Sequence, residues 1–156
     1  MNDQSQGEGV AVRFASIRTH RFVVEREAAN LEAIDDVVFG FAAGIDWDLA
    51  EGYIAVHLVV RLQSEPRPDA PAFATVETET RYWVRGLDAT PDATQINLPD
   101  TLVEDILSNA YATTRGLALV RGQGTVLEKF PLPMQSGDRL VELIQSGEAQ
   151  PLTVEE

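Results

Sequence analysis

Alternating apolar and polar residues fill much of the first two thirds of the chain and predict β-strands. The regular alternation is clearest in residues 53–63, where every second side chain is apolar from Ile54 to Leu62. A period of two indicates a strand with one buried face. Residues 36–48 alternate in the same way, and only a short segment separates the two runs. We therefore expect these two strands to form a hairpin.

Two further segments predict strands on either side of this hairpin. In residues 10–27, apolar residues fall at Val12 and Phe14, slip in phase to Ile17, and resume at Phe22. A phase slip within a long strand suggests a β-bulge or a break. Residues 64–71 contain three prolines and predict a loop, and residues 73–86 predict a fourth strand.

The pattern changes to a helical period in the last third of the chain. Leu98-Pro99-Asp100 is a helix start, because proline suits the first turn and acidic residues suit the positive end of the helix dipole. Apolar residues then recur on one face as far as Leu117, and glycines at 122 and 124 end the helix. Residues 138–145 predict a short second helix. Four antiparallel strands followed by a long and a short helix make an α+β fold.

The composition bounds the class of protein. We expect one domain over residues 10–145, with a disordered segment at 1–9 and a flexible acidic tail at 146–156. The net charge of −13 argues against nucleic-acid binding, although an acidic surface also fits adaptation to a saline cytoplasm. No apolar run is long enough to span a membrane, the N-terminus does not have the pattern of a signal peptide, and there is no cysteine. The cytoplasm is the expected location.

A search for catalytic and metal-binding patterns gives no positive signal. His20 and His57 each lie in a predicted strand without a histidine partner or the spacing of metal ligands on a helix, so we expect no metal site. The acidic pairs at 35–36 and 46–48 flank strand ends, where turns favour aspartate. We expect no enzymatic activity and no cofactor.

Large apolar residues exceed what one sheet face of a small domain can bury. Four of them alternate along residues 36–48, and Trp83 shares a strand face with charged residues; the set is Phe39, Phe41, Ile45, Trp47 and Trp83. These faces are either core and subunit interface or an apolar groove for extended peptide, and the two interpretations are compatible.

The order of several short motifs resembles that of SecB-family proteins. Ala110-Tyr111-Ala112-Thr113-Thr114-Arg115-Gly116, then Gly124-Thr125, then Leu132-Pro133 is similar to the helical signature of that family. The export chaperones have a Pro-Tyr-Ala-Arg stretch here, whereas the Thr-Arg-Gly of this chain is more similar to a divergent SecB-like branch. The strand order also matches, so the resemblance covers residues 10–145.

The resemblance implies a homotetramer, a dimer of dimers, that holds unfolded polypeptides without ATP in apolar grooves. Export chaperones of the family deliver clients to the motor SecA through an acidic sheet face and a zinc-binding tail. Glu25, Glu77 and Glu79 are the candidates for such docking here, but Arg21 replaces the aspartate that accompanies Glu25 in the family. The tail at 150–156 has neither Cys nor His, so zinc-assisted docking to SecA is not expected.

Two alternatives stay open at this point. A SecB-like relative can serve as the dedicated chaperone of a toxin–antitoxin module. A non-chaperone oligomeric scaffold can also share the fold, because fold does not fix function.

Overall fold

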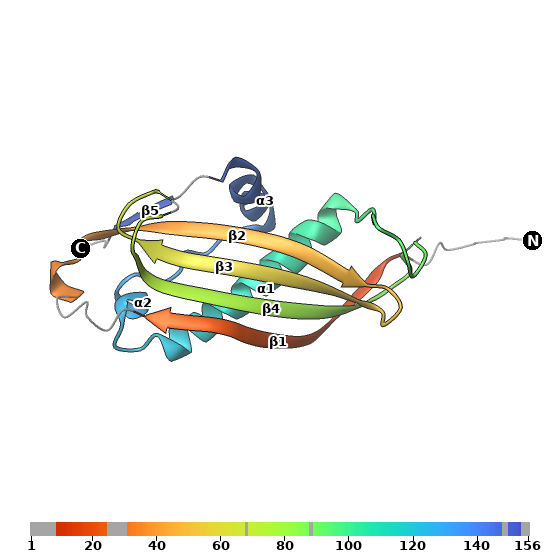
Figure 1. The fold of residues 1–156 in the computed structure, drawn as a ribbon, viewed down its shortest axis with the longest axis horizontal. Coiled ribbons are helices and arrows are strands. Elements are labelled where there is room, and N and C mark those ends of the chain that lie inside the picture. The colour runs from red at the N-terminus through yellow and green to blue at the C-terminus, as the bar shows by residue number, and fades with distance from the viewer. Residues whose placement is uncertain (1–8, 25–30, 68, 88, 148–149, 154–156) are drawn as a thin grey trace, which may run out of the picture.

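The computed structural model describes residues 9–24, 31–67, 69–87, 89–147 and 150–153, and it confirms the predicted α+β order. A five-stranded antiparallel sheet has the strand order β1-β4-β3-β2-β5, and its helices lie on one face (Figure 1). The elements in chain order are β1 (Ala11–Val24), a 3-10 turn (Leu31–Ala33), β2 (Asp36–Asp48), β3 (Tyr53–Gln63), β4 (Ala72–Arg85), α1 (Asp100–Arg121), α2 (Val126–Lys129), α3 (Gly137–Ser146) and β5 (Gln150–Thr153). We call the side of the sheet that packs on the helices the helix face, and the opposite side the outer face.

The phase slip in the first strand corresponds to two irregularities in β1. Its pairing with β4 shifts register between Phe14 and Ser16 and again between Thr19 and Arg21. At each shift β1 has one residue more than β4, which is the definition of a β-bulge. The two shifts keep Phe14, Ile17 and Phe22 on the helix face despite their uneven spacing.

The β2–β3 hairpin has the bounds that the alternation predicted. Pairing runs from Val38 with Gln63 to Asp48 with Tyr53. The connecting turn uses Gly52 at a positive φ of 78°, a conformation that favours glycine. The Asp48 carboxylate accepts a hydrogen bond from the Glu51 N–H at 3.0 Å, which closes the turn.

The core lies between the helix face and α1. The even-numbered residues of β3 from Ile54 to Leu62 are at most 1% exposed and pack with the buried stripe of α1. Thr78 of β4 and Thr114 of α1 share a buried hydrogen bond of 2.8 Å, which ties sheet to helix. Of the predicted helix stripe, Ile106, Leu107, Ala110 and Thr114 are buried.

The chain after α1 turns sharply and packs back on the helix. A Cβ on Gly122 would lie 2.5 Å from the Ala118 carbonyl oxygen, so only glycine fits at this helix end. The connector before α3 is held by Tyr111, whose hydroxyl donates to the Pro133 carbonyl at 2.6 Å, and by Arg115, which donates to the Leu132 carbonyl at 2.7 Å. Helix α3 then packs against α1 and β2. Among the described residues, no helix is long and apolar enough to cross a membrane.

Strand β5 lies in the segment for which the sequence predicted a flexible tail. Residues 150–153 pair antiparallel with residues 36–39 of β2 and extend the sheet by one short strand. The predicted disordered residues 1–8 lie outside the described part of the chain.

Candidate functional site

The apolar residues that the sequence assigned to a peptide site on β2 share the helix face but differ in burial. Phe39 is 1% exposed and belongs to the core, so the ring is out of reach of a ligand. Phe41, Ala43, Ile45 and Trp47 are half-buried and pack on the core from its margin. We call these four residues the β2 stripe.

The β2 stripe borders a strand edge that has no strand partner over most of its length among the described residues, although helix α3 packs against β2. β5 pairs only with residues 36–39 of β2. Within the described chain, residues 40–48 have β3 on one side and no strand on the other. An open edge presents backbone N–H and C=O groups that can pair with another extended chain.

Two aromatic rings of the β2 stripe are held in place from the protein side. Phe41 meets the Tyr111 ring edge-to-face, with ring centroids 5.8 Å apart. The Trp47 indole N–H donates to the Ala93 carbonyl at 3.2 Å, in the segment between β4 and α1. Each ring is therefore oriented before any ligand arrives, which lowers the entropy cost of binding.

Trp83, the fifth candidate, lies on the outer face and not beside the β2 stripe. Its side chain is 44% exposed, and its ring meets Tyr53 edge-to-face at 6.3 Å. A shallow cavity of about 340 Å³ opens next to it, lined by residues 11–13, 51–52 and 83–85. A peptide on the β2 stripe would not reach Trp83.

The helix side also carries a groove that the sequence reasoning missed. It has a volume of about 440 Å³ and lies between β1 and the first half of α1, where Phe14 is 46% exposed. Its lining is mixed, with Val12, Phe14 and Leu102 beside Asp105 and Asn109. The sequence shows that residue 14 is a phenylalanine. That this side chain is exposed and lies beside α1 follows only from the fold.

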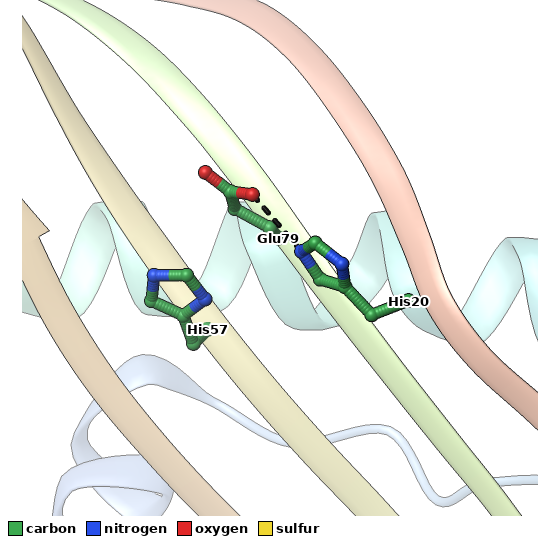
Figure 2. Close-up of side chains that lie close together, drawn as sticks. All are labelled: His20, His57 and Glu79. Carbon is green, nitrogen blue, oxygen red and sulfur yellow. Dashed lines mark hydrogen bonds and ion pairs between the residues drawn. The ribbon is translucent and has the colours of Figure 1, made fainter.

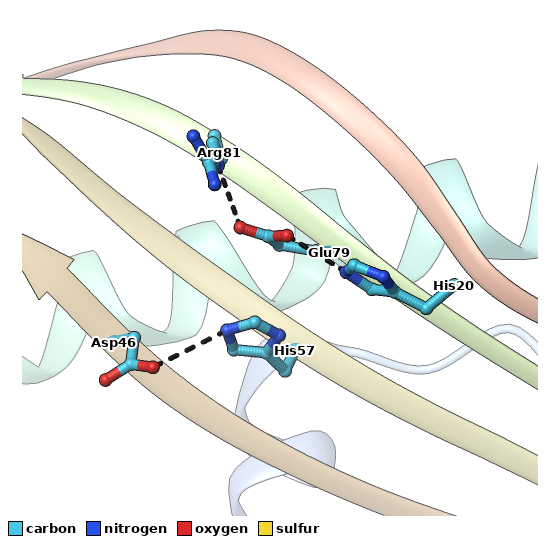
Figure 3. A network of polar contacts seen from close by, with 5 residues as sticks. All are labelled: His20, Asp46, His57, Glu79 and Arg81. Carbon is cyan, nitrogen blue, oxygen red and sulfur yellow. Dashed lines mark hydrogen bonds and ion pairs between the residues drawn. The ribbon is translucent and has the colours of Figure 1, made fainter.

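The outer face carries a polar network centred on Glu79 of β4. One Glu79 oxygen accepts a hydrogen bond from Arg81 at 2.8 Å, and the other lies 2.9 Å from His20 Nε2 of β1 (Figure 3). His57 of β3 stacks against His20 with ring centroids 6.3 Å apart, and its Nε2 lies 3.7 Å from Asp46 of β2. Four neighbouring strands thus contribute to one cluster.

Glu79 stays ionised in this network. Burial acts to raise the pKa of the Glu79 carboxyl, but hydrogen bonds from Arg81 and His20 outweigh burial and hold that pKa below its usual range. Because Glu79 is only 7% exposed and both of its oxygens have partners, it does not offer a free acidic contact to another protein.

The outer face carries arginines beside the glutamates that the sequence assigned to partner docking. Cross-strand pairs place Arg18 opposite Glu79, Arg21 opposite Glu77, and Arg13 opposite Trp83. Glu77 is half-buried between these strands, and Glu25 lies outside the described residues. Arginines lie around the two described glutamates, and the predicted acidic docking surface stays a prediction.

Comparison with known proteins finds a similarity to a solved structure. No family model and no curated protein matches the chain. Among solved structures, the chain is similar to a SecB-like chaperone of Mycobacterium tuberculosis, solved in complex with a ChAD peptide from the HigA1 antitoxin. The identity is 15%, the match covers 80% of this chain and 87% of that chain, and the TM-score is 0.43. A similarity of this size does not establish a function, so the case for one rests on the residues of this chain.

Proposed function

We propose that the chain is an ATP-independent holdase of the SecB-like type that binds extended, unfolded polypeptide without covalent chemistry. The observation that carries the proposal is the half-buried β2 stripe beside the part of the β2 edge that has no strand partner. The edge supplies backbone partners and the stripe supplies apolar contacts, the two components of strand-addition recognition.

The length and spacing of the site suit an extended ligand. Phe41, Ala43, Ile45 and Trp47 recur at every second residue, as the side chains on one face of a bound strand would. Six residue steps at roughly 3.4 Å each give a site about 20 Å long. A segment of six to seven residues with alternating apolar side chains fills it.

Strand β5 is an internal example of the proposed binding mode. It is an extended segment that pairs antiparallel with β2, on the same edge and directly before the open part. A client strand beside the part of residues 40–48 that has no strand partner would pair with β2 in the same way. The backbone contacts do not depend on client sequence, which suits a holdase for many clients.

The groove between β1 and α1 is a second contact region for the same client class. Phe14 and Val12 provide the apolar wall, and Tyr82 at its base is held by a hydrogen bond to Asn109 at 2.8 Å. Since the two regions lie at opposite edges of the sheet, a long unfolded chain can contact both, and two weak contacts on one chain reinforce each other.

We also propose that the protein assembles through its helix layer, as a tetramer. Several large apolar side chains there are exposed in the single chain: Leu119 at 40%, Val120 at 72%, Met134 at 83% and Ile144 at 37%. Their exposure resembles that of subunit contacts in homo-oligomers. The β2 stripe stays available on the outside if the contact is confined to these residues.

Suppression of aggregation tests the proposed function. Light scattering of several unrelated refolding clients should fall when this protein is added in molar excess without ATP. The assay is run at low and high salt, because the charge of −13 makes electrostatic repulsion salt-dependent. Unchanged scattering for every client would contradict a general holdase and favour either a chaperone dedicated to one partner or a scaffold.

A further inference from the structure

The outer face brings together the only two histidines of the chain and one glutamate. His20, His57 and Glu79 come from β1, β3 and β4, and their potential ligand atoms lie within 4.8 Å of one another (Figure 2). The residues are far apart in sequence, so the sheet register alone creates the cluster. Glu79 sits on the middle strand, with one histidine on each neighbouring strand.

The register places the three side chains on the same side of the sheet. His57 pairs directly with Glu79 across β3 and β4, and residues paired in an antiparallel sheet point to the same face. His20 is the extra residue at the second irregularity of β1, next to Arg21, which pairs with Glu77. A bulge of this kind re-aims a side chain, and here it directs His20 toward Glu79.

The donor set is one that zinc uses in proteins. Two imidazole nitrogens and one carboxylate oxygen form a known three-ligand set for this ion, with water in the fourth position. Calcium and magnesium prefer sites built from oxygen ligands, so two histidines disfavour them.

A small adjustment would bring the three groups to zinc distances. Ligand atoms of a tetrahedral zinc at about 2.0–2.1 Å lie about 3.3 Å apart. His20 Nε2 and Glu79 Oε2 are 2.9 Å apart, so the ion would replace the proton that they now share. The side chains of His20 and His57 are 48% and 42% exposed, so both rings have room to turn toward the ion.

The surroundings supply outer partners of the kind that orient metal ligands. Asp46 lies 3.7 Å from His57 Nε2, and Figure 3 shows the other ring nitrogen on the side of His20 and Glu79. A carboxylate on the far nitrogen of a ligating histidine fixes its tautomer and raises its basicity. Arg81 holds the second oxygen of Glu79 at 2.8 Å, which leaves the first oxygen for the ion.

We propose that His20, His57 and Glu79 form a zinc-binding site on the outer face. The site is separate from the β2 stripe, which lies on the helix face, and it does not depend on the proposed chaperone function. It links β1, β4 and β3, so bound zinc crosslinks the centre of the sheet and stabilises the folded chain.

Titration calorimetry with zinc chloride tests the proposal on the full-length protein after removal of metal by a chelator and dialysis. We expect one zinc per chain. His20→Ala and His57→Ala should each weaken binding by at least about tenfold, because loss of an outer partner alone costs 10–100-fold at many metal sites. Glu79→Gln should weaken binding as well. The matched control is Glu77→Gln, two residues along the same strand and face, which should leave the affinity unchanged.

Two further readouts separate a metal site from a change in folding. Cobalt(II) should give the intense visible absorption of a tetrahedral complex in the native protein and lose it in His57→Ala. Zinc should raise the unfolding temperature of the native protein and of Glu77→Gln, but not that of His57→Ala. Equal zinc binding by the native protein and both histidine variants would overturn the proposal, and so would one zinc per two chains, which indicates a bridge between molecules.

Discussion

Replacing Trp47 by alanine separates a peptide-binding role of the β2 stripe from a purely structural one. The side chain is half-buried at an open strand edge, and its indole N–H is bonded to the Ala93 carbonyl. If the stripe binds clients, the substitution should weaken client binding more than it weakens the fold. Leu58→Ala is the comparison for stability and Trp83→Ala the comparison for client binding.

The expected cost in stability follows from burial. Leu58 is 1% exposed in the core, so Leu58→Ala should lower the free energy of unfolding by about 3–4 kcal/mol. Truncating Trp47 removes a half-buried ring and one hydrogen bond, and the space left behind opens to water, so its cost should be about 2 kcal/mol. For a chain of this size these losses lower the melting temperature by roughly 10 °C and 5 °C.

The expected loss of client affinity follows from the solvent-facing side of the Trp47 ring. An aromatic anchor in a peptide site contributes on the order of 2 kcal/mol, which is about a thirtyfold change in affinity. Fluorescence anisotropy with a labelled unfolded client measures this affinity, and circular dichroism confirms that each variant is folded at the assay temperature. Trp83→Ala removes the same side chain from the opposite face and should leave the client affinity unchanged.

Two results would refute the reasoning. If Trp47→Ala lowers the melting temperature as much as Leu58→Ala and client affinity per folded molecule is unchanged, Trp47 is a core residue and the β2 stripe is not the site. If Trp83→Ala weakens binding and Trp47→Ala does not, clients bind on the outer face near Trp83.

Three other predictions concern stability and assembly. Because the pKa of Glu79 is lowered in the folded chain, Glu79 stabilises the fold at pH values above the usual glutamate pKa of about 4.3, and this stabilisation is lost as the pH falls below that value. The melting temperatures of the native protein and of Glu79→Gln should therefore converge in acid. Gly122→Ala should be strongly destabilising, because its Cβ would meet the Ala118 carbonyl oxygen at 2.5 Å; a melting temperature within a degree or two of the native value would contradict the packing of this turn. Light scattering coupled to size exclusion should give the mass of a tetramer for the native protein and a lower mass for Val120→Glu. A native monomer at micromolar concentration would exclude the proposed assembly.

Strand and helix positions could be predicted where a periodic pattern was long enough. Residues 36–48 and 53–63 have the observed bounds because each alternates over more than ten residues. Helix α2 was missed because four residues hold too little periodicity. Strand β5 was missed because it is equally short and contains Pro151, which is tolerated in it because β5 is an edge strand.

The candidate sites were predictable only in part, because they depend on which strands lie side by side. Alternation identified the β2 stripe. It could not show that Phe39 is buried while Phe41 is only half-buried, because this difference depends on how far the helices reach over the sheet. The histidine cluster was rejected from sequence because His20 and His57 are 37 positions apart with no shared element. They meet because both of their strands pair with β4, a relation that no local pattern contains.

The arginines of the outer face bear on how this protein would release its clients. Six of the 12 basic residues lie at outward positions of β1, β3 and β4, on the face that also carries Glu77, Glu79 and Asp46: Arg13, Arg18, Arg21, Arg61, Arg81 and Arg85. The face therefore mixes basic and acidic side chains on a chain whose net charge is −13. The binding role that we propose for the β2 stripe lies on the opposite face of the sheet and does not require delivery to the export motor.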